Sequence, residues 1–345
     1  MSPYHPAEPG AARGGTLMID TLLAAGHLGL QNLIAPAALF FILGMAAGAA
    51  RSDLAFPEAT VKTFALYLML CIGFKGGVEA ARAGLSTDFL RAGLAGLGLS
   101  LSFPLIAFPL LRRLGGLDRA TAAATAAAFG SVSVVTFAAG SDFLRSQDVA
   151  FGGYMAAVLA LMEAPAILTG LLLARFRRGA DSAGGTGILR EVLLGGPALV
   201  LAGSFVIGAL TGERGMAKLD LFVNPLFQGV LCLFLLEMGL VAARTLGEGS
   251  RLPPRLLAIG VVLPLTGASL GLTLSWLSGL GAGDAALLTL LAASASYIAA
   301  PAAMRLALPE ARPEVYLTLA LGVAFPFNLI LGIPLYHAVA TAMLG

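Results

Sequence analysis

The stretch FGSVSVVTFAAG at residues 129–140 places two serines, a threonine and two glycines inside an apolar run. A second stretch of this kind, ASASYIAAPAAM, follows at residues 293–304 and carries two serines and a proline. Glycine and proline weaken a helix, and a hydroxyl group in an apolar environment is costly unless it finds a hydrogen-bond partner. The two stretches therefore predict two helices that are interrupted where their polar groups lie.

The chain around these stretches is strongly apolar. Of its 345 residues, 58% are hydrophobic and 12% are charged, and the mean hydropathy is +0.90. Charged residues make up roughly a quarter of a typical soluble domain, and a helix needs ~20 apolar residues to span a membrane. The composition predicts an all-α polytopic membrane protein. The formal net charge of +2 gives no basic surface for nucleic acid.

Charged residues and Pro/Gly clusters divide the apolar sequence into ten predicted spans. They lie near 31–50, 56–80, 89–111, 119–139, 150–174, 190–211, 220–243, 255–277, 284–303 and 314–342. These bounds give a first five-helix repeat over 18–174, a connecting loop over 175–189 and a second repeat over 190–345. Residues 1–17 lack the pattern of a signal peptide and are expected to form a disordered tail, with Met18 as an alternative start.

The two halves resemble each other at an offset of about 161 to 163 residues. Each half has five spans, an odd number, so the second half enters the membrane from the opposite side. The sequence thus predicts a 5+5 inverted repeat with broken fourth and ninth helices, a build typical of secondary transporters. The matched stretches are PAALFFILGMAAG at 36–48 with PALVLAGSFVIGA at 197–209, KGGVEAAR at 75–82 with EMGLVAAR at 237–244, and SVSVVTFAA at 131–139 with SASYIAAPA at 294–302.

Positive charges are distributed unevenly between the two sides of this predicted bundle. Loops on the side of the N-terminus hold six Lys or Arg residues, loops on the other side hold fourteen, and Lys75 falls inside a span. By the positive-inside rule, both termini face outward and the loop over 175–189 is cytoplasmic.

The interrupted fourth and ninth spans form the candidate binding site, because corresponding broken helices carry the binding sites of inverted-repeat transporters. Each would present a helix N-terminus whose free N–H groups favour an anion. The alternative is that small residues only allow close helix packing, but two such stretches at repeat-equivalent positions favour a binding site. The candidate anion-binding residues are Ser131, Val132, Ser133, Thr136, Ser294, Ser296, Tyr297, Ala299 and Ala300.

Glu163 is an ionisable residue inside the fifth predicted span. A charge at that depth costs at least ~2.5 kcal/mol on insertion scales, which makes it a functional candidate. It could bind Na⁺, carry a proton or pair with a neighbour. Lys75 and Glu237 occupy repeat-equivalent positions and are interpreted as snorkelling or structurally paired side chains. The candidate Na⁺ ligands are Ser133, Thr136, Glu163, Ser296 and Asn328.

Enzyme signatures are weak. GAGD at 281–284 matches the GxGD of intramembrane aspartyl proteases, but no Tyr-Asp dipeptide supplies a second aspartate and Asp284 lies at the edge of a span. His5, His27 and His337 are scattered and make no metal site. We therefore expect no enzymatic activity and no cofactor apart from a coupling ion.

The sequence resembles the sodium-dependent bicarbonate transporter family known from cyanobacteria, over nearly all of the chain from about Met18. The resemblance implies Na⁺-driven bicarbonate uptake across the bacterial inner membrane by a lipid-embedded homotrimer. It implies an elevator in which spans 3–5 and 8–10 move against a scaffold of spans 1, 2, 6 and 7, and a PII-like protein as a cytoplasmic regulator. The stretches that carry it are IGFKGG at 72–77, SVSVVT at 131–136, LMEAPAILTGLLLA at 161–174, NPLFQGVLCLFLLEMGLVAAR at 224–244, ASASYIAAP at 293–301 and GIPLY at 332–336.

Two positions differ from the pattern that the resemblance implies. Val135 stands where the family has a serine, and Tyr297 replaces an acidic residue associated with the cyanobacterial Na⁺ site, while Glu163 stands where that form has an aspartate. Loss of a carboxylate would weaken Na⁺ binding, although the phenol of a tyrosine still offers an oxygen. Two alternatives stay open: a symporter of the bile-acid or cation–proton antiporter type, and a non-transporting membrane sensor.

Overall fold

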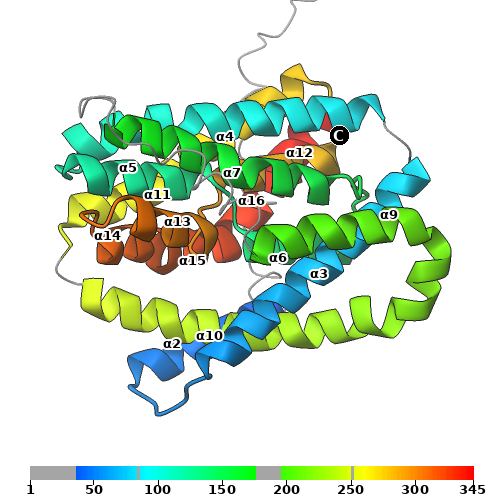
Figure 1. Cartoon of the computed structure of the whole chain (residues 1–345), viewed down its shortest axis with the longest axis horizontal. Helices are drawn as coiled ribbons and strands as arrows, with labels where there is room; N and C mark the ends of the chain where they lie inside the picture. The colour runs from blue at the N-terminus through cyan, green and yellow to red at the C-terminus, as the bar shows by residue number, and fades with distance from the viewer. Residues whose placement is uncertain (1–35, 84–85, 176–195, 250–251) are drawn as a thin grey trace, which may run out of the picture.

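The computed structural model describes residues 36–83, 86–175, 196–249 and 252–345. Within these ranges the regular structure is helical and contains no β-strand. In the described part of the chain, seven helical segments are long and apolar enough to cross a membrane, and two shorter helices are also apolar. The described part of the chain therefore has the architecture of a multi-pass membrane protein (Figure 1).

Most of the predicted spans correspond to one helix each. The predicted tail over 1–17, the loop over 175–189 beyond its first residue, and the starts of the first and sixth spans lie outside the described residues. The helices are α2 Pro36–Ala49, α3 Glu58–Ala83, α4 Thr87–Arg113, α7 Met155–Arg175, α9 Gly196–Val223, α10 Pro225–Gly249 and α11 Pro254–Leu277.

The fourth and ninth predicted spans are each divided into two helices. The fourth consists of α5 Arg119–Gly130 and α6 Val134–Ser146, and the ninth consists of α12 Ala282–Ala293 and α13 Ala299–Ala307. Ser131 is the C-cap of α5 and Ser294 is the C-cap of α12, and the backbone is extended at both residues. The interruptions therefore occur at the two hydroxyl-rich stretches.

The tenth predicted span contains wider helical turns. It contains α14 Pro313–Leu317, the wider π-turns η1 Thr318–Ala324 and η2 Asn328–Gly332 around the short α15 Phe325–Phe327, and α16 Ile333–Leu344. Pro326 has no amide to donate to the preceding turn, which disturbs the regular α-helical ladder. The sequence analysis did not predict this widening.

The helices fall into two groups (Figure 1). One group contains α2 packed on α10 and α3 packed on α9, and the other contains α4 to α7 and α11 to α16. Glycine permits the close crossings in the first group. Gly77 of α3 lies against the carbonyl of Phe205, and Gly239 of α10 lies against the carbonyl of Phe41. Gly77 and Gly239 are repeat-equivalent, so the two crossings are the same contact made by the two halves.

These crossings adjust the alignment of the halves. The sequence alignment pairs Phe41 with Ala202, whereas the structure gives Phe41 and Phe205 the same role opposite the two glycines. The first and sixth spans are therefore displaced by three residues from their sequence alignment. Leu and Ala repeat so often in both spans that composition alone does not fix this register.

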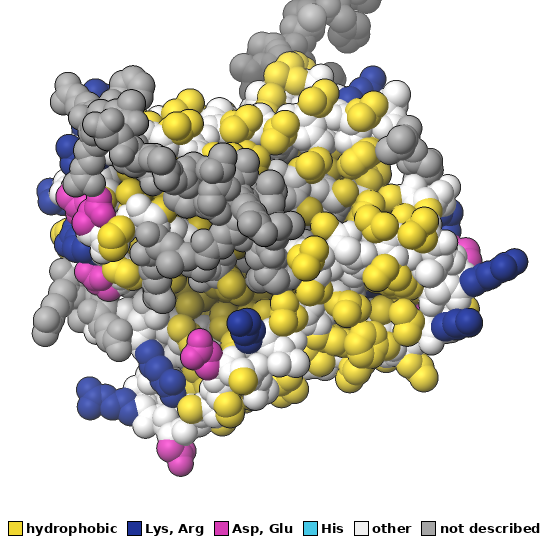
Figure 2. All heavy atoms as spheres, in the orientation of Figure 1, with side chains coloured by type: hydrophobic (Ala, Val, Ile, Leu, Met, Phe, Trp, Pro, Cys, Tyr) yellow, Lys and Arg dark blue, Asp and Glu magenta, His cyan; other side chains and the backbone are white. Residues whose placement is uncertain are grey.

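The surface is suited to lipid. Leu94, Leu210 and Leu221 have exposed fractions of 72%, 81% and 78%, which would be unfavourable in water. In Figure 2, apolar side chains cover much of the visible face, whereas most Lys, Arg, Asp and Glu side chains lie towards its ends. The helices in the same view run mainly between these ends, as expected for a membrane-spanning bundle (Figure 1).

Candidate functional site

Two serines shape the break between α5 and α6. Ser131 ends α5 and donates its amide to the carbonyl of Ala127 at 3.0 Å. Ser133 precedes α6, and its hydroxyl accepts the amide of Thr136 at 3.2 Å. This is the N-cap interaction that serine favours, because it satisfies an amide that has no partner within the helix. The hydroxyls predicted to form a site thus also define where the helix restarts.

The break between α12 and α13 repeats this arrangement. Ser294 ends α12, and the hydroxyl of Ser296 accepts the amide of Ala300 at 3.1 Å. Ser294 is equivalent to Ser131 and Ser296 to Ser133 at an offset of 163 residues. The two halves therefore use the same pair of serines to end one helix and begin the next.

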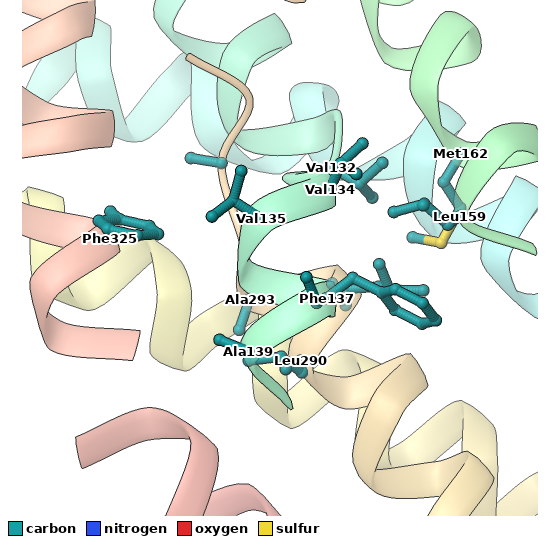
Figure 3. Packing of buried hydrophobic residues seen from close by; sticks show 14 of the residues in the cluster. Val132, Val134, Val135, Phe137, Ala139, Leu159, Met162, Leu290, Ala293 and Phe325 are labelled. Atoms are coloured by element: carbon teal, nitrogen blue, oxygen red, sulfur yellow. The ribbon is translucent and has the colours of Figure 1, made fainter. Parts of the chain in front are cut away.

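The two breaks are hydrogen-bonded to each other. The amide of Ser133 donates to the hydroxyl of Ser294 at 3.0 Å, and the amide of Ser296 donates to the carbonyl of Ala128 at 2.8 Å. Figure 3 shows Val132 and Val134 directed towards Leu159 and Met162 of α7, and Val135 on the side of Phe325. The extended segments are thus enclosed by protein, as irregular backbone at membrane depth requires.

A small pocket lies where the breaks meet. Its volume is about 20 Å³, which is space for about one water-sized group. Both α6 and α13 begin at this pocket, so the unpaired amides of their first turns and the positive ends of their dipoles lie close to it. Its lining residues are Met69, Val132, Ser133, Val134, Val135, Glu163, Ser296, Tyr297, Ile298 and Ala299.

Glu163 brings a carboxylate into this lining. Its exposed fraction is 7%, and its backbone carbonyl accepts the hydroxyl of Ser131 at 3.0 Å. Among the described residues, the carboxylate makes no ion pair and no side-chain hydrogen bond. The described residues also hold no cluster of three or more His, Cys, Asp or Glu side chains that would suit a transition metal. A hard cation bound by a few oxygens is the ion that this lining could hold.

Comparison with protein families gives one match over nearly the whole chain. A model of the Na⁺-dependent bicarbonate transporter superfamily matches residues 36–341. The chain belongs to that superfamily. The resemblance found in the sequence is thereby confirmed, and membership makes the chain a multi-pass membrane transporter rather than an enzyme. A comparison with individual curated proteins gives no match.

Six of the predicted site residues of this superfamily member line the pocket, and four others are hydrogen-bonded to residues of the lining. Ser131 and Ser294 are the helix ends described above, and Thr136 and Ala300 supply the amides that the capping serines accept. The six in the lining are Val132, Ser133, Glu163, Ser296, Tyr297 and Ala299.

Asn328, a predicted Na⁺ ligand, lies outside the pocket lining. Its side-chain amide donates to the carbonyl of Ala293 at 2.8 Å, and its side-chain oxygen accepts the hydroxyl of Tyr336 at 2.9 Å. Both polar groups of the amide are therefore occupied by protein. These contacts favour a role in holding the end of α12, and ion ligation by Asn328 stays a prediction.

Tyr297 contributes a buried ring to the site. The ring packs edge-on against Phe325 at 5.5 Å between centroids. Its hydroxyl is buried and makes no hydrogen bond of normal geometry within the described residues, although it lies near enough to Ser133 for the two side chains to interact. The phenol oxygen is thus available to a bound ion or anion.

Met69, Val134, Val135 and Ile298 complete the lining and were not predicted as site residues. The two valines and Ile298 lie inside the predicted stretches, between residues that were chosen as site residues, and their apolar side chains gave no reason to choose them. Met69 comes from α3, and no local feature of the sequence links it to the breaks.

Proposed function

We propose that this chain takes up bicarbonate together with Na⁺, and that both bind between the N-termini of α6 and α13. The observation that carries the proposal is the position of Glu163, a buried carboxylate without a cationic partner beside two helix N-termini. The helix N-termini favour an anion, and the carboxylate favours a cation. A site with both features suits the joint binding of an anion and a small cation.

The capping serines support anion binding. A hydroxyl has two acceptor lone pairs and one proton to donate. The hydroxyls of Ser133 and Ser296 accept backbone amides, so each keeps its proton for an oxygen of the substrate. Free amides in the first turns of α6 and α13 would add further donors. Bicarbonate offers three oxygens in one plane and can accept from both sides at once.

Glu163 supports Na⁺ coupling. A negative substrate and an ionised carboxylate in one small pocket repel each other unless a cation lies between them. Na⁺ would remove that repulsion, with oxygens from Glu163, Ser133 and the phenol of Tyr297 as the nearest candidates. Binding of each ion would then strengthen binding of the other, which favours the doubly loaded protein that symport requires.

The size of the pocket favours this substrate over the main transport alternative. A volume of about 20 Å³ is space for about one water-sized group, so bicarbonate with Na⁺ would need the two breaks to move slightly apart, whereas a bile acid would require the surrounding helices to separate. A cation–proton antiporter would use Glu163 as a proton carrier and would need no anion beside it. That alternative therefore does not explain why two helix N-termini meet at the pocket.

We also propose the family's transport cycle. The group of α2, α3, α9 and α10 would be the scaffold, and the group containing both broken helices would be the elevator. The equivalent crossings at Gly77 and Gly239 support ten spans in a 5+5 inverted repeat. A homotrimer in the bacterial inner membrane, termini facing outward and a PII-like regulator remain proposals from the family.

Radiolabelled bicarbonate uptake into liposomes containing the purified protein tests the function. We expect uptake to require an inward Na⁺ gradient. Uptake that is independent of Na⁺ would contradict the coupling, and transport of another anion without bicarbonate uptake would contradict the substrate. A membrane potential, negative inside, should accelerate uptake only if more than one Na⁺ accompanies each bicarbonate, because 1:1 transport is electroneutral.

A further inference from the structure

A second and larger cavity lies between α3, α6, α7 and α10. Its volume is about 280 Å³. Its lining includes Glu79 near the end of α3, Arg145 near the end of α6 and Gly153 just before α7. The cavity therefore opens at one end of the bundle, where these three helices end or begin. In the proposed topology this end faces outward.

Two cationic side chains line this cavity, and each lies over an aromatic ring. The Nζ of Lys75 lies 4.2 Å from the centre of the Phe227 ring, and the guanidinium of Arg145 lies 5.1 Å from the centre of the Phe151 ring. Both rings also line the cavity. A cation–π contact holds the cation in place but leaves its charge uncompensated. In the part of the chain that the structure describes, neither cation makes an ion pair.

The acidic residues nearby have other partners. Glu79, which also lines the cavity, accepts from Arg82 at 3.2 Å. The carboxylate of Asp142 accepts the side-chain amide of Gln228. Asp142 keeps its charge but lies outside the lining, so within the lining two cations, Lys75 and Arg145, face one acid, Glu79, and the low-dielectric walls focus their field.

The cavity and the broken-helix pocket follow each other along the same helices. On α3 the pocket has Met69 and the cavity has Ile72 in its lining, and on α6 the pocket has Val134 and the cavity has Phe137. Each pair is three residues apart, or about one helical turn of 5.4 Å. Figure 3 shows Phe137 on α6 on the side that faces α7, beyond Val134. A layer of apolar side chains thus separates the two spaces.

We propose that this cavity is a second anion site, a vestibule in which Lys75 and Arg145 collect the transported anion before it reaches the broken helices. Its ligand class is a small inorganic anion, and its role as a vestibule rests on the proposed function. The inverted repeat does not duplicate it at the other end, because the residue equivalent to Lys75 is the buried acid Glu237. The basic cavity is therefore a property of one face only.

Initial rates of bicarbonate uptake into proteoliposomes test the vestibule. Lys75→Met and Arg145→Gln should each raise the KM for bicarbonate about five-fold or more, leave the maximal rate and the Na⁺ dependence unchanged, and weaken the dependence of uptake on ionic strength. Lys75→Arg, which keeps the charge, should have the KM of the wild-type protein. Lys62→Met, an exposed lysine on the same helix, is the matched control. An unchanged KM in both cavity variants would overturn the proposal.

A labelling experiment tests the positive field without transport. In a variant with Cys71→Ala and Cys232→Ala, Ala150→Cys places a thiol in the cavity lining. An anionic methanethiosulfonate should react faster than a cationic one, after normalisation to a free thiol. Adding Lys75→Met and Arg145→Gln should lower that ratio about five-fold or more. An unchanged ratio would overturn the anion site. A lowered ratio without bicarbonate uptake would support the anion site while contradicting the proposed substrate.

Discussion

The amide of Ser133 donates to the hydroxyl of Ser294 at 3.0 Å, joining the breaks of two helices that lie 161 residues apart in the chain. Ser294 also donates its proton to the carbonyl of Leu291 at 2.8 Å. Its hydroxyl is therefore fully occupied by the two broken helices. The equivalent serines Ser133 and Ser296 only accept amides, which leaves their protons to a substrate. Ser294 thus joins the two broken helices, whereas the hydroxyls of Ser133 and Ser296 face the site.

Ser133→Val and Ser296→Val should each abolish transport. Valine removes both the cap acceptor and the donor to the substrate, and its side chain has one heavy atom more than that of serine. Loss of a serine cap typically costs about 1 kcal/mol, so the protein should still fold. Uptake in proteoliposomes should fall to background while size-exclusion chromatography shows the wild-type assembly. Ser102→Val, at an exposed serine of α4 that bonds its own helix, should transport normally. Normal rates in both site variants would show that the anion binds elsewhere.

Glu163→Gln should weaken the binding of Na⁺. Glutamine keeps the shape of the side chain but removes the charge that we propose to attract the cation, so half-maximal uptake should need about ten-fold more Na⁺ or more. Uptake measured against Na⁺ concentration checks this. Glu58→Gln, in the exposed first turn of α3, is the control. Uptake in wild-type protein that follows a pH gradient and ignores Na⁺ would favour the proton-carrying alternative.

Local pattern in the sequence was sufficient to locate the breaks. Gly130 and Ser131 weaken one helix, and Ser294 and Ser296 weaken the other, because serine competes for backbone hydrogen bonds and glycine adds flexibility. The alignment of the two halves also predicts that the two breaks occupy equivalent positions. These features depend on near neighbours in the chain, which is why a sequence pattern reveals them.

Long-range contacts could not be predicted in the same way. Asn328 reaches the carbonyl of Ala293 across 35 residues, a contact that its predicted role as a Na⁺ ligand did not include. Lys75 and Arg145 were assigned to a span and a loop, yet the fold places both in one cavity. Nothing in the spacing of the two residues indicates this, because it depends on how α3 packs beside α6.

Gly77→Ala should destabilise the protein, and Gly239→Ala should do the same. A Cβ at either position would overlap a carbonyl oxygen of the facing helix, and such overpacking typically costs about 1–3 kcal/mol. Thermal unfolding in detergent should show a lower Tm for both. Gly98→Ala, where the added Cβ meets open space, is the matched control and should keep the Tm or raise it slightly. Equal Tm values in all three variants would contradict the close crossings.

Asp118→Asn should reduce stability at neutral pH but not in acid. Partial burial favours a higher pKa for Asp118, but hydrogen bonds from Thr121 and the charge of Arg312, whose Nε lies 3.6 Å away, outweigh it, and the pKa is lowered. A lowered pKa in the folded protein stabilises it above the unfolded pKa of ~3.9, and this stabilisation is lost as the pH falls through the folded value.

At pH 7 the asparagine variant should therefore unfold at a slightly lower temperature than wild type. The loss in free energy of unfolding should be less than about 1 kcal/mol, because the Asp118–Arg312 pair is half exposed. Asparagine is itself a good N-cap, so helix capping survives the change. The difference should shrink as the pH falls below about 4, where the wild-type carboxylate takes up its proton. Asp53→Asn, at an exposed site between α2 and α3, should show no such trend. A difference between Asp118→Asn and wild type that stays constant from pH 7 to pH 3.5 would mean that Arg312 and Thr121 do not stabilise the charge.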